Sequence, residues 1–186
     1  MNLDSKNNKL LIIGCKPWDN NILEVQGLEY AHFIDYYIGD APAIILETFH
    51  HIDVNDVGIY SHMTENPAGK LSEFTNIYAE YFNTIIIDWA TYQHFNRDSA
   101  WTDFAKLLKN DGKLVIPIIS CNIMTNESNA LEKAYILSDK LHNFNGIDLY
   151  NYENMPTLPS NLLTCDRLGN SDEMIKMNPI IIFATK

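Results

Sequence analysis

Short apolar runs of strand length alternate along the chain with segments of helical periodicity. Several runs are apolar at successive positions and rich in β-branched residues. Strands covered on both faces of a parallel sheet need this composition, because neither face meets water. The pattern predicts up to six strands, at Lys9 to Cys15, Ala31 to Tyr37, Ala43 to Glu47, Asn83 to Trp89, Lys113 to Ile119 and Asn178 to Thr185.

The segments between the later runs have apolar residues at steps of three and four, which is typical of amphipathic helices. One stripe runs from Leu71 to Tyr81, a second from Trp101 to Leu108, and a third segment from about Ser128 to His142. The alternation predicts a doubly wound α/β domain, with helices on both faces of a mostly parallel sheet. The length of 186 residues fits one domain, residues 1–186.

Two segments lack such periodicity. Residues 1–8 are polar and are expected to form a flexible N-terminus. Residues 151–178 contain Pro156 and Pro159 and few periodic positions, so we expect an irregular connection or a lid.

Candidate binding residues follow the apolar runs, because ligands of parallel sheets bind beyond the carboxyl ends of the strands. Gly14 follows the first run, and Asp35 follows the second at a spacing that suits hydrogen bonds to ribose hydroxyls. Glu47 ends the third run and Asp88 nearly ends the fourth. Each candidate also has a structural alternative. Gly14 could simply form a turn, the acids could be solvated loop residues, and Asp88 could cap the following helix.

Together these segments resemble a family. Leu10 to Cys15, Phe33-Ile34-Asp35, Glu47, Phe82 to Phe95, and Phe104 to Ile116 with Asn110-Asp111 in place of Pro-Gly are similar to class I S-adenosylmethionine-dependent methyltransferases. The resemblance implies a Rossmann-like fold whose last strand, near Asn178 to Lys186, is antiparallel. It also implies that Gly14 and Cys15 approach the cofactor, that Asp35 holds the ribose, and that Glu47 or a neighbour lies near the adenine. Asp88 would meet the adenine amine or the substrate.

Histidines are the other candidates for chemistry. His94 follows the fourth run, where a neutral imidazole could remove a proton from an attacking atom. A histidine packed at a helix start beside Phe95 is the structural alternative. His50 and His51 adjoin Asp53, but neighbouring residues point in different directions, so loop histidines are favoured over metal ligands. No metal site is predicted.

The first glycine loop departs from the family pattern. Lys16 stands where a second glycine is usual, and Pro17 restricts it to extended backbone. This departure predicts weak cofactor binding or none. Two functions stay open: a methyltransferase acting on a small molecule or a protein side chain, and a non-catalytic binding or interaction module that retains the fold.

Composition narrows the partners. The net charge is −11, so binding to nucleic acid would need a local basic patch, and the sequence shows none. No apolar run is long enough to span a bilayer, and no secretory signal is evident, so a cytoplasmic protein is expected. The three cysteines are widely separated, which favours reduced thiols. Aromatic residues between Trp18 and Tyr37 offer core packing, a stacking surface or contacts for a homo-oligomer.

Overall fold

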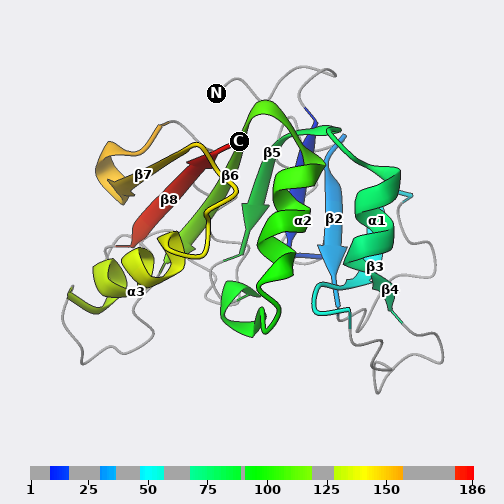
Figure 1. Cartoon of the computed structure of the whole chain (residues 1–186), viewed down its shortest axis with the longest axis horizontal. Helices are drawn as coiled ribbons and strands as arrows, with labels where there is room; N and C mark the ends of the chain where they lie inside the picture. Colours follow the sequence, from blue (N-terminus) through cyan, green and yellow to red (C-terminus); the bar gives the residue numbers. More distant parts are fainter. Residues whose placement is uncertain are drawn as a thin grey trace.

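The structure is a computed structural model that describes residues 9–16, 30–36, 47–56, 68–88, 91–118, 128–156 and 179–186. Its centre is an eight-stranded sheet in the order β4-β3-β2-β1-β5-β6-β8-β7. The first strand lies inside the sheet, between the second strand and the fifth (Figure 1). Strand order therefore reverses at β1, which is where an open α/β sheet binds its ligand.

Six strands run parallel to one another. They are β1 (Leu10–Ile13), β2 (His32–Asp35), β3 (Phe49–Asp53), β4 (Gly69–Lys70), β5 (Phe82–Ile87) and β6 (Leu108–Ile118). The last strand, β8 (Ile180–Thr185), is antiparallel to β6 and to the edge strand β7 (Gly146–Asn151). The predicted Rossmann-like, mostly parallel sheet and its antiparallel last strand are confirmed. Helices on both faces of the sheet stay a prediction, because most of the residues that connect β1 with β2 and β2 with β3 lie outside the described residues.

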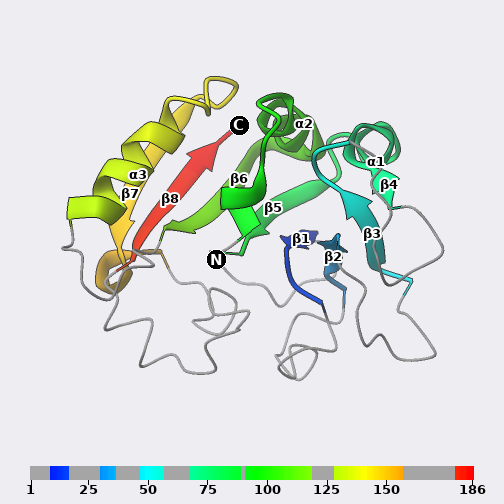
Figure 2. The ribbon, with the colours of Figure 1, turned by 90° about the horizontal axis from the view of Figure 1, so that it is seen from below.

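Among the described residues, three α-helices cover one face of the sheet, as Figures 1 and 2 show. They are α1 (Leu71–Ile77), α2 (Ser99–Leu107) and α3 (Ser128–Ser138), with the short 3-10 helices η2 (Thr91–His94) and η3 (Tyr152–Asn154). All three were predicted, although each ends earlier than its apolar pattern. The segments that connect β1 with β2 and β2 with β3 lie outside the described residues, apart from the residues nearest the strands.

The core lies between this sheet and these helices. Every residue of β1 is buried, and so are the last four residues of β5. On the helix side, Leu71 and Phe74 of α1 and Trp101 and Phe104 of α2 are 4% exposed or less. Continuous apolar strands and one apolar stripe on each helix account for this arrangement.

Two predicted segments differ from the structure. Of the third predicted strand, at 43–47, residues 43–46 lie outside the described residues and Glu47 is a turn residue, whereas the strand that pairs with β2 is β3, which begins at Phe49 and contains His50 and His51. The unpredicted strand β7 occupies 146–151, so the expected irregular segment starts with a strand residue and a 3-10 turn. β7 was missed because it is an edge strand whose residues are exposed or half-buried, and it lacks an apolar run. The predicted flexible residues 1–8, and most of the predicted lid, lie outside the described residues.

Candidate functional site

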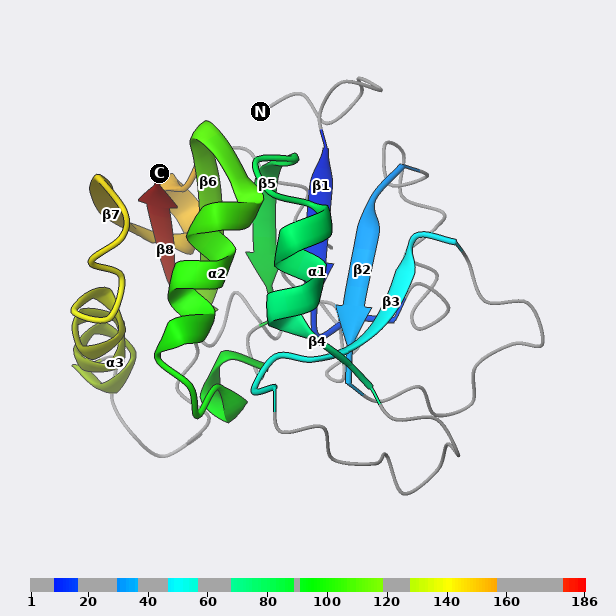
Figure 3. The same cartoon turned by 45° about the vertical axis from the view of Figure 1, so that its right-hand side comes forward.

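The carboxyl ends of three neighbouring strands meet at the middle of the sheet (Figure 3). The Gly14 N–H donates to the Ile34 carbonyl at 2.8 Å, and the Asp88 N–H donates to the Ile13 carbonyl at 2.8 Å. These bonds hold the backbone after β1 between the end of β2 and the end of β5. Gly14, Asp35 and Asp88 are thus brought together, as the sequence predicted.

Gly14 has a local reason to be glycine. Its φ is +87°, and a Cβ added there would lie 1.8 Å from the Oγ1 atom of Thr91. The backbone conformation disfavours any L side chain, and the space that a side chain would fill holds the Thr91 hydroxyl. The missing Cβ therefore serves the packing of Thr91 against β1.

Thr91 also contacts the end of β5. Its N–H donates to the Asp88 carbonyl at 3.0 Å, and its hydroxyl lies 3.4 Å from Asp88 Oδ2. Asp88 is 7% exposed, so its carboxylate is held inside the edge of the sheet. Cys15 is buried beside Gly14, and Lys16 is half-buried. Pro17 lies outside the described residues.

Glu47 does not join this group. It is an exposed turn residue that precedes β3, next to Thr48, whose carbonyl accepts the Phe33 N–H at 2.8 Å. Because β2 and β3 are parallel, the amino end of β3 lies beside the amino end of β2, whereas Asp35 lies at the carboxyl end of β2. The acid at the carboxyl end of β3 is Asp53, which is 4% exposed. The sequence interpretation missed Asp53 because it placed the strand too early.

The turn after Asp53 is tied to the chain that follows η2. The Asn55 N–H donates to Asp53 Oδ1 at 2.9 Å. The Asn55 side-chain amide donates to the His94 carbonyl at 2.9 Å, and its Oδ1 accepts the Asn96 N–H at 2.8 Å. Two segments far apart in sequence are therefore joined at the carboxyl edge.

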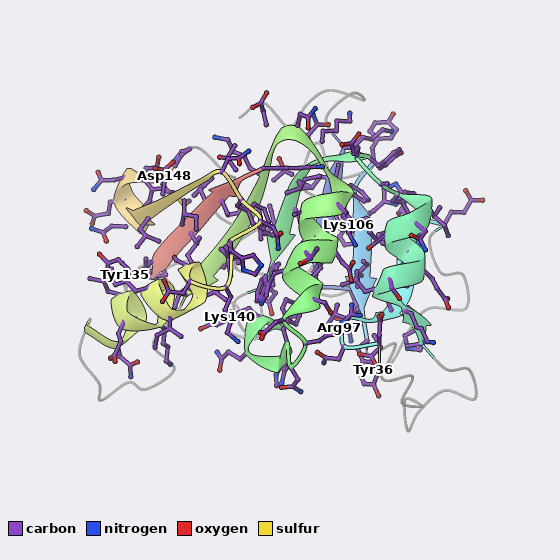
Figure 4. All side chains as sticks on the ribbon, viewed as in Figure 1. Tyr36, Arg97, Lys106, Tyr135, Lys140 and Asp148 are labelled. Carbon is purple, nitrogen blue, oxygen red and sulfur yellow. The ribbon has the colours of Figure 1, made fainter. Side chains whose placement is uncertain are left out.

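A charged network extends this junction onto the helices. Asp56 accepts the Leu71 N–H at 2.7 Å, which caps α1, and it pairs with Arg97 at 2.6 Å. Arg97 also pairs with Asp103 of α2 at 2.8 Å. Figure 4 shows Arg97 near the start of α2. The Arg97 guanidinium joins the turn after β3 to α2. Arg97 and Asp56 are far apart in the sequence, so no short sequence motif predicts that they form an ion pair.

The histidines have different surroundings. His94, the weak catalytic candidate, ends η2 with an exposed side chain, and its backbone carbonyl anchors Asn55. His50 and His51 are residues of β3, so their interpretation as loop histidines was wrong. As expected for strand neighbours, they make separate contacts: His51 Nε2 lies 2.8 Å from the Tyr36 carbonyl, and His50 contacts the α1 side.

His32 and His50 form a pair under α1. His32 Nδ1 lies 2.9 Å from His50 Nε2, and the rings stack with centroids 5.2 Å apart. Phe74, Tyr78 and Phe82 contact this pair at their ring edges. Burial, the neighbouring His50 and Lys9 lower the pKa of His32 from 6.5 to about 4, and burial also lowers the pKa of His50. Both imidazoles are therefore neutral at pH 7.

Neither a metal site nor a membrane span is found in the described part of the chain. Its residues contain no group of three or more His, Cys, Asp or Glu side chains arranged to hold a metal ion. None of the helices described is long and apolar enough to cross a membrane.

Comparison with known proteins supports the architecture. No protein-family model and no curated protein matches the chain. A chain from the complex between the Haloferax volcanii Trm112 methyltransferase activator and a methyltransferase superposes with a TM-score of 0.51, at 10% identity over 97% of this chain and 83% of that one. A protein from Listeria monocytogenes, assigned as an S-adenosylmethionine-dependent methyltransferase, gives a TM-score of 0.51 at 14% identity, over 98% and 91% of the two chains. The chain therefore has the fold of class I S-adenosylmethionine-dependent methyltransferases.

Proposed function

We propose that the chain is an S-adenosylmethionine-dependent methyltransferase that acts on a small molecule or a protein side chain. The observation that carries this proposal is the convergence of Gly14, Asp35 and Asp88 at the point where strand order reverses. The fold supports it, but fold alone does not fix function.

The residues at this edge suit the cofactor's chemistry. A nucleoside offers ribose hydroxyls and an adenine amine as hydrogen-bond donors, and carboxylates accept from both. Asp35, half-buried at the end of β2, is the residue that would hold the ribose. Asp53, at the end of β3, would take the place near the adenine that was expected for Glu47, and Asp88 would lie between cofactor and substrate.

The bound cofactor supplies an electrophilic methyl group on a positively charged sulfur. The chain's contribution is to orient the acceptor and to exclude water, because displacement at a methyl group depends mainly on alignment. Thr91 and the buried Asp88 fix the start of η2 beside β1, and His94, the exposed residue at its other end, is the candidate that would take a proton. A base is needed only where the acceptor atom loses a proton.

We interpret Lys16 as a residue that lowers the affinity for the cofactor, and not as a sign that the chain has a different function. Its side chain replaces a glycine hydrogen next to Cys15, and its positive charge disfavours a neighbouring sulfonium. The alternative function, a binding module that has lost the cofactor, predicts that neither the wild type nor Lys16→Gly binds. Our proposal predicts that both bind, the variant more tightly.

Thermal unfolding with S-adenosylhomocysteine tests the proposal. A ligand that binds only the folded state, at about one hundred times its dissociation constant, stabilises it by roughly 2.7 kcal/mol. For a domain of this size the unfolding midpoint should then rise by roughly 5 to 10 °C. At a fixed ligand concentration we expect a smaller rise for the wild type than for Lys16→Gly.

Asp35→Ala supplies the matched loss-of-binding variant. Without ligand, its free energy of unfolding should stay within about 1 kcal/mol of the wild type, since Asp35 lies at the rim of the sheet. With ligand, its midpoint should rise least of the three proteins. A loss of several kcal/mol without ligand would instead place Asp35 in a structural network and remove it from the ribose site.

A further inference from the structure

A cavity of about 280 Å³ lies away from the strand ends, between η2, the start of α2 and α3. Its floor is apolar: Phe95, Trp101 and Leu137 line it, and each is 8% exposed or less. Its volume is close to the lower limit of about 300 Å³ that is usual for small-molecule sites. The cavity therefore has room for one or two rings.

The wall on the α3 side is unusual for a surface helix. Ile136 lines the cavity with 58% of its surface exposed, although the neighbouring Leu137 is buried. An exposed isoleucine beside a concave aromatic surface gives a flat ligand an apolar contact on two sides. Tyr92 and Gln93 of η2 complete the opposite rim and offer polar contacts.

Two lysines stand at the rim of the cavity. Lys133 and Ile136 of α3 line the cavity at a spacing of three residues, which places them on one side of the helix, and Lys140 lines it from the turn that follows α3. None of the ion pairs found among the described residues includes Lys133. Lys140 pairs with Asp98 at 3.1 Å, but both side chains are well exposed, so this pair exchanges readily with another anion.

Charge and shape together specify a ligand. The chain carries only 13 Lys and Arg residues against 24 Asp and Glu, yet the charged residues that line this cavity are two lysines and no carboxylate, with Asp98 paired to Lys140 from outside the lining. Figure 4 shows Lys140 next to the start of α2, and both Lys140 and Trp101 of α2 line the cavity. We propose that this cavity binds a small aromatic carboxylate, with the ring on Phe95 and Ile136 and the carboxylate at Lys133 and Lys140. This site is separate from the strand ends and does not depend on methyl transfer.

Calorimetric titration with 2-naphthoate, and with uncharged 2-naphthamide as its isostere, tests this site. We expect 2-naphthoate to bind the wild type with one saturable site, and the amide to bind about tenfold more weakly, because it lacks the ionic contacts. The variant Lys133→Gln/Lys140→Gln should lose about the same factor for 2-naphthoate and none for the amide.

Two further variants locate the binding. Lys70→Gln/Lys106→Gln removes the same charge from lysines that do not line the cavity, and it should bind 2-naphthoate as the wild type does. Ile136→Trp should fill the cavity and block both ligands, while its exposed position keeps the fold intact. The proposal is overturned if 2-naphthoate shows no saturable binding, if the amide binds equally well, or if the cavity variants bind like the wild type.

Discussion

Gly14 and Thr91 lie against each other at the candidate site, and they show how one residue constrains another far away in sequence. The φ of +87° and the 1.8 Å that would separate an added Cβ from Thr91 Oγ1 act together against any larger residue. Gly14→Ala should lower the free energy of unfolding by about 2 to 4 kcal/mol, combining the left-handed backbone with overpacking. Urea denaturation measures this loss.

A double variant separates the two causes. Adding Thr91→Gly to Gly14→Ala removes the clash but leaves the unfavourable backbone conformation. It should recover part of the lost stability, beyond what Thr91→Gly costs alone. If Gly14→Ala costs less than about 1 kcal/mol, the contact with Thr91 is not the reason for the glycine.

The His32–His50 pair makes stability depend on pH. The folded-state pKa values of both histidines are lowered, so protons bind more readily to the unfolded chain as the pH falls below 6.5; for His32 this interval extends down to about pH 4. The stabilisation is complete above pH 6.5 and is lost as the pH falls towards 4. For His32 the lowering from 6.5 to about 4 corresponds to about 3 kcal/mol.

Denaturation at several pH values between 7 and 4 measures this dependence. His32→Phe/His50→Phe should lose less stability than the wild type over the interval. Identical slopes for the wild type and the double phenylalanine variant would show that the pair does not titrate as its burial requires.

At the scale of elements, Asp56 joins three of them. It caps α1 through the Leu71 N–H and, through Arg97, connects the β3 turn with α2. Asp56→Ala should lower the free energy of unfolding by about 2 to 4 kcal/mol, because it removes a helix cap and leaves Arg97 with a single carboxylate partner in this network. Asp56→Asn retains an acceptor for the Leu71 N–H and should cost clearly less. Equal losses for the two variants would mean that the acceptor for the Leu71 N–H contributes nothing and that the loss comes from the charge paired with Arg97.

The apolar pattern predicted those elements whose burial is continuous. β1 and β5 are buried along nearly their whole length, so their runs stood out, and Gly14, Asp35 and Asp88 followed from the strand ends. The pattern did not predict β3, because His50 and His51 interrupt its apolar residues. Since the strand was predicted too early in the chain, Glu47 was predicted as its terminal acid and Asp53 was not. The roles of three residues could not be predicted from periodicity, because they depend on contacts between segments that are far apart in the sequence. These residues are Asn55, Thr91 and Arg97.

At the scale of the whole molecule, the sheet presents two ligand regions on different surfaces. The strand ends carry carboxylates that suit a nucleoside with a cationic sulfur, and the cavity between α2 and α3 carries lysines that suit an anion. The 3-10 helix η2 belongs to both, since Thr91 packs on Gly14 while Tyr92 and Gln93 line the cavity. Because carboxylates lie at the strand ends and lysines line the cavity, we expect a cationic ligand to prefer the first region and an anionic ligand the second.

Binding of S-adenosylmethionine at the end of β1 is the centre of the proposed function, and direct calorimetric titration of this cofactor tests it without knowledge of the acceptor. We expect one saturable site on the wild type and a lower dissociation constant for Lys16→Gly. For Asp35→Ala the dissociation constant should be at least about tenfold higher, corresponding to the loss of a charged hydrogen-bond acceptor. The absence of saturable binding to both the wild type and Lys16→Gly would contradict the proposed function and favour the non-catalytic module.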